Sequence, residues 1–582
     1  MADTPFLIGV TGHRDLAPGQ EERIIAELGD FFGELKRHLP NTEIRVMTGM
    51  ADGADRLAAT VALEQGLKVD AVLPMPLGLY EQDFSAESAQ ALEALLENPK
   101  VKQIELPIPQ GVDRELAGAP GPERDKLYDN LARHLIRKSS LVLALWDGLD
   151  NGLVAGTSDV LFRFLEARAE GRHEAGEVTL LDGAELKASG PEYAYWVPVT
   201  REGARAVGDL SGASYISGSL GLRTLARHQE VPGPLQGQLK ELDSYNAQLK
   251  QLKQSRPVAD SGGLLADYPD YGELPNFEAL EAIDAEYTKA DALAMHNQGQ
   301  SDRMFKIFAL MAASMGFLFL VYAKISAEEI FLILYLALFI LGMVLLWWAR
   351  RSRWFSKHLM YRVIAESMRT KFYLALAGVD RLVDVQQLIR LTGIDQFSGF
   401  SWVMTVFKDV EPGAAAERMP DAALSRTVGF VHKEWIDGQA SYFKRKSAQL
   451  SERHHRLERI KNLLLLILVL ATLALLFFKG YLKPYLFPGI SLKTSLVFLM
   501  GLLPVWLGVW ELYQNQMATK ELLWQYRNQA ERFSRTALQL SRTEGWRHQQ
   551  PILAELGQRS LVENFLWTIH RYHRDFEPPV AA

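Results

Sequence analysis

The 582-residue chain contains no cysteine. Disulfide bonds and thiolate metal ligands are therefore excluded as sources of stability or chemistry. An excess of positive charge is also lacking, because the formal net charge is −7 and no strongly basic domain stands out. We therefore expect no direct nucleic-acid binding, which depends on neutralising phosphates. The length predicts several domains, each able to bury a core.

Several familiar signals are absent as well. Met1–Pro5 has neither a basic leader nor an apolar core, so we expect no cleaved signal peptide. No His-Glu-x-x-His motif, Walker loop or nucleophile elbow occurs in the sequence. We therefore assign neither a metal site nor catalytic residues. Long apolar runs are missing from the N-terminal half, which indicates a soluble domain there.

The C-terminal half, in contrast, contains four apolar stretches of 16 to 20 residues. They are Ile307–Ala323, Ile330–Ala349, Leu463–Phe478 and Thr494–Trp510, the last interrupted by Pro504. As helices they would cover about 24–30 Å, close to the roughly 30 Å of a bilayer's hydrocarbon core. The stretches predict four transmembrane helices arranged as two hairpins.

Basic residues flank the predicted hairpins more densely than they occupy the two turns. The flanking cations are Arg303, Lys306, Arg350, Arg351, Arg353, Lys357, Arg453, Arg456, Arg459 and Lys461. The positive-inside rule then places the N-terminal domain and both termini in the cytoplasm. We expect a multi-pass protein of the bacterial inner (plasma) membrane.

A short pattern occurs after each hairpin. Tyr361–Glu366 and Tyr526–Glu531 both read Tyr-Arg-x-x-Ala-Glu, and a Tyr-x-Lys pattern precedes each hairpin at Tyr287 and Tyr442. The recurrence predicts a duplicated unit of helix, hairpin and helix.

Residues 1 to about 210 alternate between strand and helix patterns. The predicted strands are Phe6–Val10, Ile44–Met47, Val69–Leu73, Gln103–Leu106, Leu141–Trp146 and Tyr195–Val199. The predicted helices are Gln20–His38, Ala54–Gln65, Ser85–Glu97, Glu123–Lys138 and Ser158–Ala167. This alternation predicts a doubly wound, mostly parallel α/β sheet, whose ligand is expected beyond the carboxyl ends of the strands.

Glycine-rich segments follow three of these strands. Glycine lets backbone amides approach an anion, and a helix N-terminus adds free N–H groups and a positive dipole. The Thr157 hydroxyl could donate to a phosphate, Arg14 could pair with it, and Asp52 could accept from a ribose hydroxyl. The candidate ligand-binding residues are Thr11, Gly12, His13, Arg14, Gly49, Asp52, Gly53, Asp55, Trp146, Asp147, Gly148, Gly156 and Thr157.

These segments resemble the SLOG superfamily of Rossmann-like domains over about residues 5–205. The motifs that carry the resemblance are Gly9-x-Thr11-Gly12-His13-Arg14, Thr48-Gly49-x-Ala51-Asp52-Gly53-Ala54-Asp55, Leu73-Pro74 with Tyr80 and Asp83-Phe84, and Leu145-Trp146-Asp147-Gly148 leading to Gly156-Thr157. The resemblance implies a domain that binds nucleotides or nucleotide-derived signals.

The paired hairpins resemble SLATT domains, which are two-transmembrane effectors associated with nucleotide signalling in bacterial conflict. The resemblance covers about residues 275–380 and 435–550. It implies a pore or membrane-perturbing effector that a nucleotide signal triggers, in many cases against phage.

One departure from the SLOG pattern concerns catalysis. Related phosphoribohydrolases carry a catalytic Glu three residues after the loop threonine, whereas this chain has Val160 there. Valine cannot replace a carboxylate that must act on the ribose, so we favour sensing over catalysis. The alternatives are a membrane-tethered nucleotide hydrolase that uses Asp52 or Asp159 as acid–base group, and a structural assembly with a degenerate SLOG-like domain.

The expected fold class is thus an α/β Rossmann-like cytoplasmic domain joined to an all-α membrane domain with four transmembrane helices in two repeated hairpins. The expected parts are a sensing domain (1–210), a helix and linker (211–275), a first two-span unit (276–380), a connector (381–430) and a second two-span unit (431–582). No cofactor is expected. The expected activator is an ADP-ribose derivative or a cyclic oligonucleotide, the expected state is a homo-oligomer, and an enzyme encoded nearby would supply the signal.

Overall fold

The computed structural model describes residues 3–109, 111–113, 115–150, 152–166, 179–182, 192–203, 212–218, 224–255, 263–268, 274, 276–396, 399–410, 421–478, 480–482, 485–487 and 490–572. The chain divides into two compact units. The first, here called the sheet unit, comprises Met1–Ala290, Ile364–Gly378 and Asp384–Asp421; the second, the helical unit, comprises Asp291–Val363, Val379–Val383 and Ala422–Ala582.

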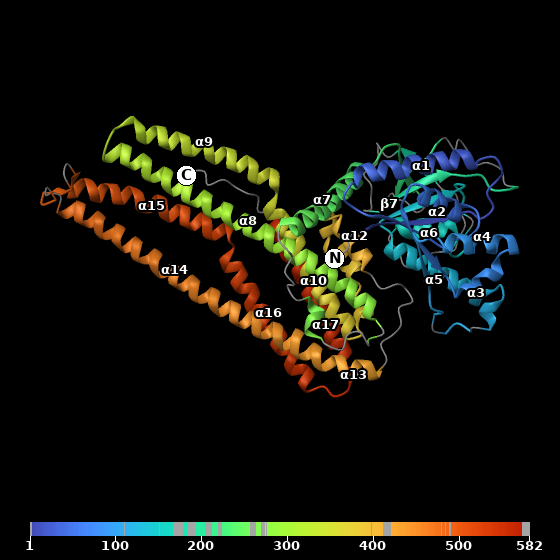
Figure 1. The fold of residues 1–582 in the computed structure, drawn as a ribbon. Coiled ribbons are helices and arrows are strands. Elements are labelled where there is room, and N and C mark those ends of the chain that lie inside the picture. The colour runs from blue at the N-terminus through green and yellow to red at the C-terminus, as the bar shows by residue number, and fades with distance from the viewer. Residues whose placement is uncertain are drawn as a thin grey trace. The chain divides into compact units, whose positions relative to one another are not determined.

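The sheet unit is built on a mixed nine-stranded sheet (Figure 1). Its order is β4-β3-β2-β1-β5-β7-β8-β9-β6. The strands are β1 (Phe6–Gly12), β2 (Ile44–Thr48), β3 (Lys68–Leu73), β4 (Val101–Glu105), β5 (Leu141–Trp146), β6 (Thr179–Asp182), β7 (Tyr193–Pro198), β8 (Ser214–Gly218) and β9 (Thr224–His228). All neighbouring strands are parallel except the pairs β7–β8 and β8–β9, which are antiparallel.

Helices follow the parallel strands. They are α1 (Glu21–His38), α2 (Ala54–Glu64), α3 (Leu77–Tyr80), α4 (Ala86–Leu96), α5 (Pro122–Lys138), α6 (Thr157–Leu165) and α7 (Gly233–Ser255). In α1 the buried residues Ile24, Leu28, Phe31, Phe32 and Leu35 recur at helical spacing, acidic residues occupy the first turn and basic residues the last. The helix therefore buries one apolar face and matches its own dipole.

The expectation of an N-terminal α/β domain is confirmed, with one correction. All six predicted strands and all five predicted helices exist, and Leu141–Trp146 has the predicted bounds. The sheet nevertheless continues beyond residue 210, because β8 and β9 belong to it. Ser214–Gly218 and Thr224–His228 are short and lie between segments without a periodic pattern, so no sequence pattern predicted them as strands.

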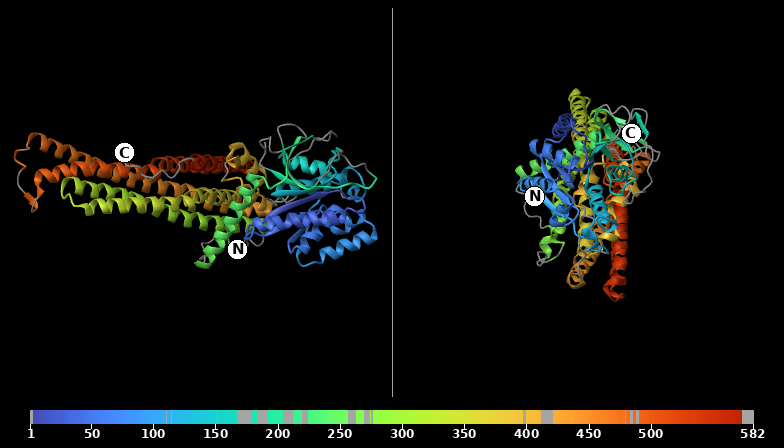
Figure 2. Two further views of the ribbon diagram at one scale, coloured as in Figure 1. Left: turned by 90° about the horizontal axis from the view of Figure 1, so that it is seen from above. Right: turned by 90° about the vertical axis from the view of Figure 1, so that its right-hand side faces the viewer.

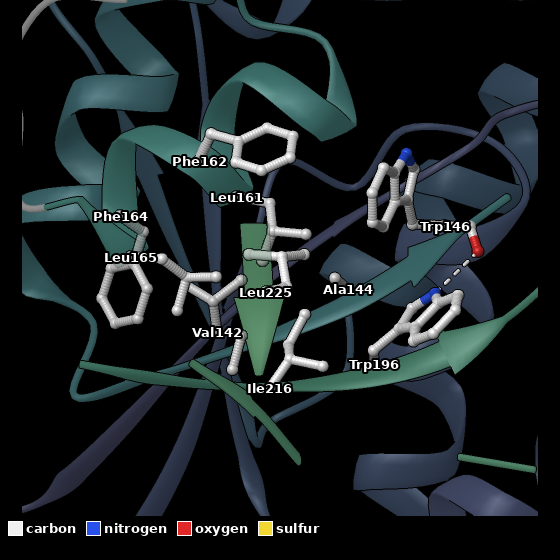
Figure 3. Close-up of a cluster of buried hydrophobic side chains, with 11 residues drawn as sticks. Val142, Ala144, Trp146, Leu161, Phe162, Phe164, Leu165, Trp196, Ile216 and Leu225 are labelled. Atoms are coloured by element: carbon white, nitrogen blue, oxygen red, sulfur yellow. Dashed lines mark hydrogen bonds between the residues drawn. The ribbon is translucent and has the colours of Figure 1, made fainter. Parts of the chain in front are cut away.

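The buried cluster that joins β5 to α6 shows how the core is filled. Trp146 and Trp196 stand on the neighbouring strands β5 and β7, and the Trp196 Nε1–H donates to the Trp146 carbonyl at 2.9 Å (Figure 3). The other members of the cluster are Val142, Ala144, Leu161, Phe162, Phe164, Leu165, Ala194, Ile216 and Leu225. Trp146 is 0% exposed, so this predicted ligand residue is part of the core.

Part of the segment predicted as a connector belongs to the sheet unit. The helices α11 (Val385–Thr392) and α12 (Val403–Asp409) lie in it. The Lys408 ammonium lies 2.8 Å from Glu192, which precedes β7, and both side chains are buried. The Lys138 side chain of α5 donates to the Asp409 carbonyl at 3.2 Å. Residues 384–410 are therefore bound to the sheet unit by buried ionic and polar contacts.

The helical unit contains α9 (Glu329–Ser352), α13 (Asp421–Phe430), α14 (Gly438–Phe477), α15 (Leu492–Gln516), α16 (Thr519–Ser541) and α17 (Trp546–Tyr572). A π-helical segment (Val431–Asp437) precedes α14, and a small hairpin of β10 (Tyr485–Phe487) and β11 (Ile490–Ser491) precedes α15. The helices α8 (Phe277–Lys324) and α10 (Trp354–Leu376) each contribute residues to both units.

Four of the described helices are long and apolar enough to cross a membrane, as predicted. They contain the expected runs in α8, α9, α14 and α15, and between 6% and 22% of each apolar window is buried inside the protein. A water-soluble helix would bury its apolar face, whereas these helices leave most of it uncovered. The chain therefore has the features of a membrane protein.

The four apolar segments contact one another within the helical unit, and Figure 2 shows α8 with α9 and α14 with α15 as two hairpins. Met304 and Phe308 of α8 pack against Leu346 and Ala349 of α9. Between the hairpins, α8 and α15 approach closely. The Trp506 Nε1–H donates to the Ala313 carbonyl at 3.1 Å, and a Cβ added to Gly316 would lie 2.5 Å from Val505.

Each hairpin ends at a residue with left-handed backbone. Arg353, between α9 and α10, has φ 53°, and Ala518, between α15 and α16, has φ 49°. The two positions are 165 residues apart, the same separation as between Tyr361 and Tyr526. A residue with left-handed backbone therefore recurs at the same spacing after each hairpin.

Candidate ligand-binding site

A cavity of about 370 Å³ opens in the sheet unit. It lies at the carboxyl ends of β1, β2 and β5, because the segments that follow these three strands all contribute to its lining. This is the edge at which open α/β sheets hold ligands. Eight of the thirteen predicted residues line it: Thr11, Gly12, His13, Arg14, Gly49, Asp55, Gly156 and Thr157.

Backbone contacts hold two of the three segments together. A Cβ added to Gly12 would lie 2.3 Å from the Cβ of Ala54 and 3.1 Å from that of Leu145. Gly53 has φ +73°, and its added Cβ would lie 2.4 Å from the Arg14 carbonyl oxygen. Both positions therefore require glycine. Gly53 thus serves loop packing and does not itself line the cavity.

The start of α6 faces the cavity. Gly156 precedes the helix and provides no side-chain cap, so the amides of the first turn lack intrahelical partners. Ala155 has left-handed backbone (φ 54°), and its N–H donates to Asp159 Oδ2 at 2.9 Å. Thr157 is buried and lines the cavity. A helix start of this kind favours an anion.

Arg14 contributes a positive charge to the same cavity. Its guanidinium lies 5.3 Å from the centre of the Tyr128 ring. Burial lowers the pKa of Arg14, but hydrogen bonding to Tyr128 and nearby negative groups outweigh this effect and raise it overall. The Tyr128 hydroxyl also contacts Asp83, which pairs with Arg124 at 2.9 Å. The cation is therefore held by an aromatic ring that is itself fixed.

His13 is oriented by a carboxylate outside the cavity. Its Nε2 lies 3.0 Å from Asp147 Oδ1, and the Leu149 N–H donates to the same oxygen at 3.1 Å. Burial raises the pKa of Asp147, but these contacts outweigh burial and lower it overall. Asp147 and Gly148, which has φ +84°, do not line the cavity and instead form the turn that positions His13.

Of the two predicted loop carboxylates, one lies outside the cavity. Asp52, predicted to accept from a ribose hydroxyl, pairs with Arg56 at 2.7 Å and accepts from the Ser88 hydroxyl at 2.5 Å. It does not line the cavity, whereas Asp55 does. Burial raises the pKa of Asp55 to about 6, against the effect of Thr48, the Ala51 N–H and the charges of Arg14 and Arg56. Of these two carboxylates, only Asp55 is therefore placed to contact a molecule in the cavity.

Several lining residues are not among the thirteen predicted ones, although Tyr80 belongs to one of the sequence motifs named above. Tyr80 donates to the Gly49 carbonyl at 2.8 Å, and Arg201, after β7, pairs with Asp15 at 2.9 Å. Leu131 and Leu135 face the cavity from α5. Their i,i+4 spacing marks one helix face, but Arg201 had no sequence signal because its position depends on where β7 enters the sheet.

The acid–base candidates of the hydrolase alternative lie elsewhere. Asp159 accepts from the Ala155 N–H and pairs with Arg163 at 3.1 Å. Neither Asp159 nor Asp52 lines the cavity, whereas the apolar Val160 does. Across the described residues, no group of three His, Asp or Glu side chains could hold a metal ion.

Comparison with known proteins identifies no relative: no family model matches the sequence, and no curated protein matches it.

Proposed function

We propose that this protein is a ligand-gated membrane effector. An anionic, nucleotide-derived messenger would bind the cavity of the sheet unit and change the packing of the four apolar helices, so that the membrane becomes permeable. One observation carries the proposal. The helix α8 is a single 48-residue element whose first turns belong to the unit with the cavity and whose last turns contain an apolar membrane segment.

The first part of α8 is anchored in the sheet unit by buried polar groups. The Glu286 carboxylate accepts from the Thr4 hydroxyl at 2.9 Å, from the Tyr245 hydroxyl at 2.7 Å and from Lys289 at 2.7 Å. Thr4 lies two residues before the start of β1, so α8 is attached at the amino end of the strand whose carboxyl end reaches the cavity. A buried, fully paired network of this kind fixes a helix in one arrangement.

A second connection runs along α5. Tyr128, Leu131, Ala132 and Leu135 of this helix line the cavity. At its end the Arg137 carbonyl accepts from Gln386 and Lys138 donates to the Asp409 carbonyl. Asp409 lies close enough to Glu286 for their charges to interact. Displacement of α5 by a ligand would thus reach the anchor of α8 through α12.

The membrane part would consist of a duplicated two-span unit, with both termini and the sheet unit in the cytoplasm of a bacterial inner membrane. The shared pattern after each hairpin and the equal spacing of Arg353 and Ala518 support the duplication. Four helices enclose little room for a conduit, so a homo-oligomer is part of the proposal. A separate enzyme would make the messenger, and a role in antiviral defence follows from the resemblance to SLOG and SLATT domains alone.

Gating has a thermodynamic requirement. The ligand must bind the permeable arrangement more tightly than the closed one, since equal affinity would shift nothing. The alternative, a nucleotide hydrolase, has less support because Asp52 and Asp159 are engaged in ion pairs outside the cavity.

The test uses the detergent-purified full chain. A panel of nucleotides, including ADP-ribose derivatives and cyclic oligonucleotides, is screened by thermal shift, and each hit is applied to liposomes that contain the protein and a trapped dye. We expect leakage only with ligand and no release of free base from it. Thr157→Asp, which places a negative charge at the start of α6, should abolish both binding and leakage.

Ser85→Asp is the matched control. Ser85 caps another helix of the sheet unit, α4, is exposed and lies outside the cavity, and aspartate is an equally good N-cap. This variant should keep ligand-dependent leakage. Leakage that persists in Thr157→Asp, or turnover of the ligand by the wild type, would contradict the proposal.

A further inference from the structure

Asp55 differs from the other acidic groups around the cavity in having no counterion in contact. It is 8% exposed and lines the cavity. Within the described part of the chain, no Lys, Arg or His nitrogen forms an ion pair with it, whereas Asp15, Asp52 and Asp147 each have such a partner. A buried carboxylate without a counterion is costly.

The surroundings of Asp55 leave acceptor capacity unused. Its Oδ2 accepts from the Ala51 N–H at a long 3.4 Å, and Thr48 is its other hydrogen-bonding neighbour. A carboxylate offers about four acceptor positions. The nearest guanidinium on its own helix, Arg56, is directed to Asp52, the Met50 carbonyl and Ser88.

The charged and titratable groups that face Asp55 come from four elements. They are Arg14 after β1, Arg56 of α2 and Tyr80 of α3, whose charges interact with that of Asp55, and Tyr128 of α5, which lines the same cavity. Tyr80 donates its hydroxyl hydrogen to Gly49, and Tyr128 contacts Asp83. Both tyrosine hydroxyls are therefore committed elsewhere, and the free face of the carboxylate is the one toward the cavity.

We propose that Asp55 recognises a ligand group that presents two adjacent hydrogen-bond donors, while the start of α6 and Arg14 hold the ligand's anion. This inference rests on the proposed function and specifies its ligand. In a nucleotide, two donors side by side occur in the ribose 2′,3′-diol and in the N1–H and amino edge of guanine.

The volume of the cavity further restricts the class of ligand that fits. A volume of about 370 Å³ is at the lower end of the roughly 300–1,000 Å³ of small-molecule sites. It suits a ligand with one nucleoside and its phosphates. Of the two classes expected from the resemblance, a small nucleotide such as an ADP-ribose fragment suits this volume better than a cyclic oligonucleotide.

A purely structural role for Asp55 has different consequences. As an acid in the first turn of α2, it could simply complement the helix dipole and hold the Ala51 N–H. Its removal would then lower stability and weaken every ligand equally. Recognition, in contrast, predicts a loss that depends on the donors of the ligand.

The experiment measures binding to the detergent-purified full chain by titration calorimetry. The probes are GMP, AMP, 2′-deoxy-GMP and inorganic pyrophosphate, which carries the anion alone. GMP and AMP binding equally but more tightly than the deoxynucleotide identifies the diol, and GMP binding more tightly than AMP identifies the guanine edge. Wild-type protein that binds all three nucleotides and pyrophosphate equally overturns the inference without any variant.

Asp55→Asn replaces one acceptor oxygen by a donor without changing the shape. It should weaken the preferred nucleotide about 10- to 100-fold, the effect of losing hydrogen bonds to a charged group, and leave pyrophosphate binding unchanged. Asp52→Asn, three residues away and outside the cavity, should change neither. An equal affinity of Asp55→Asn and wild type for the nucleotide overturns the inference while the proposed function stands.

The pH dependence gives an independent readout. Since the pKa of Asp55 is about 6, the wild-type advantage over Asp55→Asn should be present at pH 7.5 and decline as the pH falls through 6. The ligand phosphate also titrates near pH 6. This affects binding to both proteins equally, so it cancels in the ratio of the wild-type and variant affinities. A constant ratio contradicts recognition by the carboxylate. If neither the nucleotides nor pyrophosphate bind the wild type, both this inference and the proposed function fail.

Discussion

The sheet unit and the helical unit place their apolar side chains in opposite ways. In the sheet unit, Leu161 of α6 is 0% exposed among the side chains of four strands and its own helix, whereas Leu470 of α14 is 55% exposed. Leucine is thus covered by other side chains in the sheet unit, whereas in the helical unit it is left uncovered and available to contact lipid. In water only the first arrangement stabilises a fold, and in lipid the second costs nothing.

The largest expected effect is on the free energy of unfolding, when a leucine is replaced by alanine in each of the two units. Leu161→Ala should lower the free energy of unfolding by about 2–5 kcal/mol, because it leaves a cavity beside Trp146 and Trp196. Leu470→Ala should change it by less than about 0.5 kcal/mol, since no protein cavity forms. Thermal unfolding in detergent, followed by tryptophan fluorescence, measures both. Equal losses would remove the difference between the units.

The second prediction tests whether the exposed apolar face of α14 contacts lipid. Leu470→Arg should cost about 2.5–3.5 kcal/mol of membrane insertion, seen as a smaller fraction of chains that resist alkaline extraction from membranes. Leu538→Arg, on α16 and 51% exposed but outside the apolar stretches, is the control and should insert normally. Normal insertion of Leu470→Arg would mean that this face of α14 does not contact lipid.

The third prediction concerns a buried charge of the sheet unit. Burial, with a smaller contribution from Glu286, raises the pKa of Asp409 from 3.8 to about 6. The folded state then favours the protonated acid, so the carboxylate destabilises the fold at neutral pH and this cost disappears as the pH falls from 6 toward 4. Asp409→Asn should therefore stabilise the protein by about 2–3 kcal/mol at pH 7.5.

That gain should shrink in melting experiments at progressively lower pH and vanish near pH 4. Asp384→Asn is the control, because Asp384 is an exposed N-cap of α11 and asparagine caps equally well. A stabilisation by Asp409→Asn that is the same at pH 5 and pH 7.5 would contradict the assignment to this carboxyl group.

The smallest effect is expected where the helical unit does pack inward. Gly316→Ala brings a Cβ to 2.5 Å from Val505 and should cost about 1 kcal/mol through overpacking between α8 and α15. Gly508→Ala on α15, where no atom lies within 4 Å, should be neutral or slightly stabilising. The double variant Gly316→Ala/Val505→Ala should recover most of the melting temperature, and its failure to do so would place the strain elsewhere.

The sequence predicted well what depends on local pattern. Buried parallel strands such as Leu141–Trp146 are continuous apolar runs, and α6 begins at Thr157 because glycine precedes an apolar-periodic segment. The cavity itself followed from three glycine segments at strand ends, since parallel strands bring those ends together. Five of the thirteen predicted residues nevertheless lie outside its lining.

The failures share a cause, which is that side-chain direction in a loop is set by distant partners. Asp52 and Asp55 are three residues apart and equally acidic, yet the left-handed Gly53 and the i,i+4 pairing with Arg56 turn Asp52 away from the cavity. The packing of α12 on the sheet unit depends on the Lys408–Glu192 pair, which joins residues 216 positions apart. No periodic pattern in the sequence predicts such a contact.

The left-handed residues after the two hairpins have a further consequence. Neither Arg353 nor Ala518 is glycine, so each bend keeps an L-residue in a conformation that costs about 1–2 kcal/mol. An unbent form, in which one helix would run on from the membrane into water, would release that energy. The two joints therefore store conformational energy of similar size, and straightening would recover it at each of them.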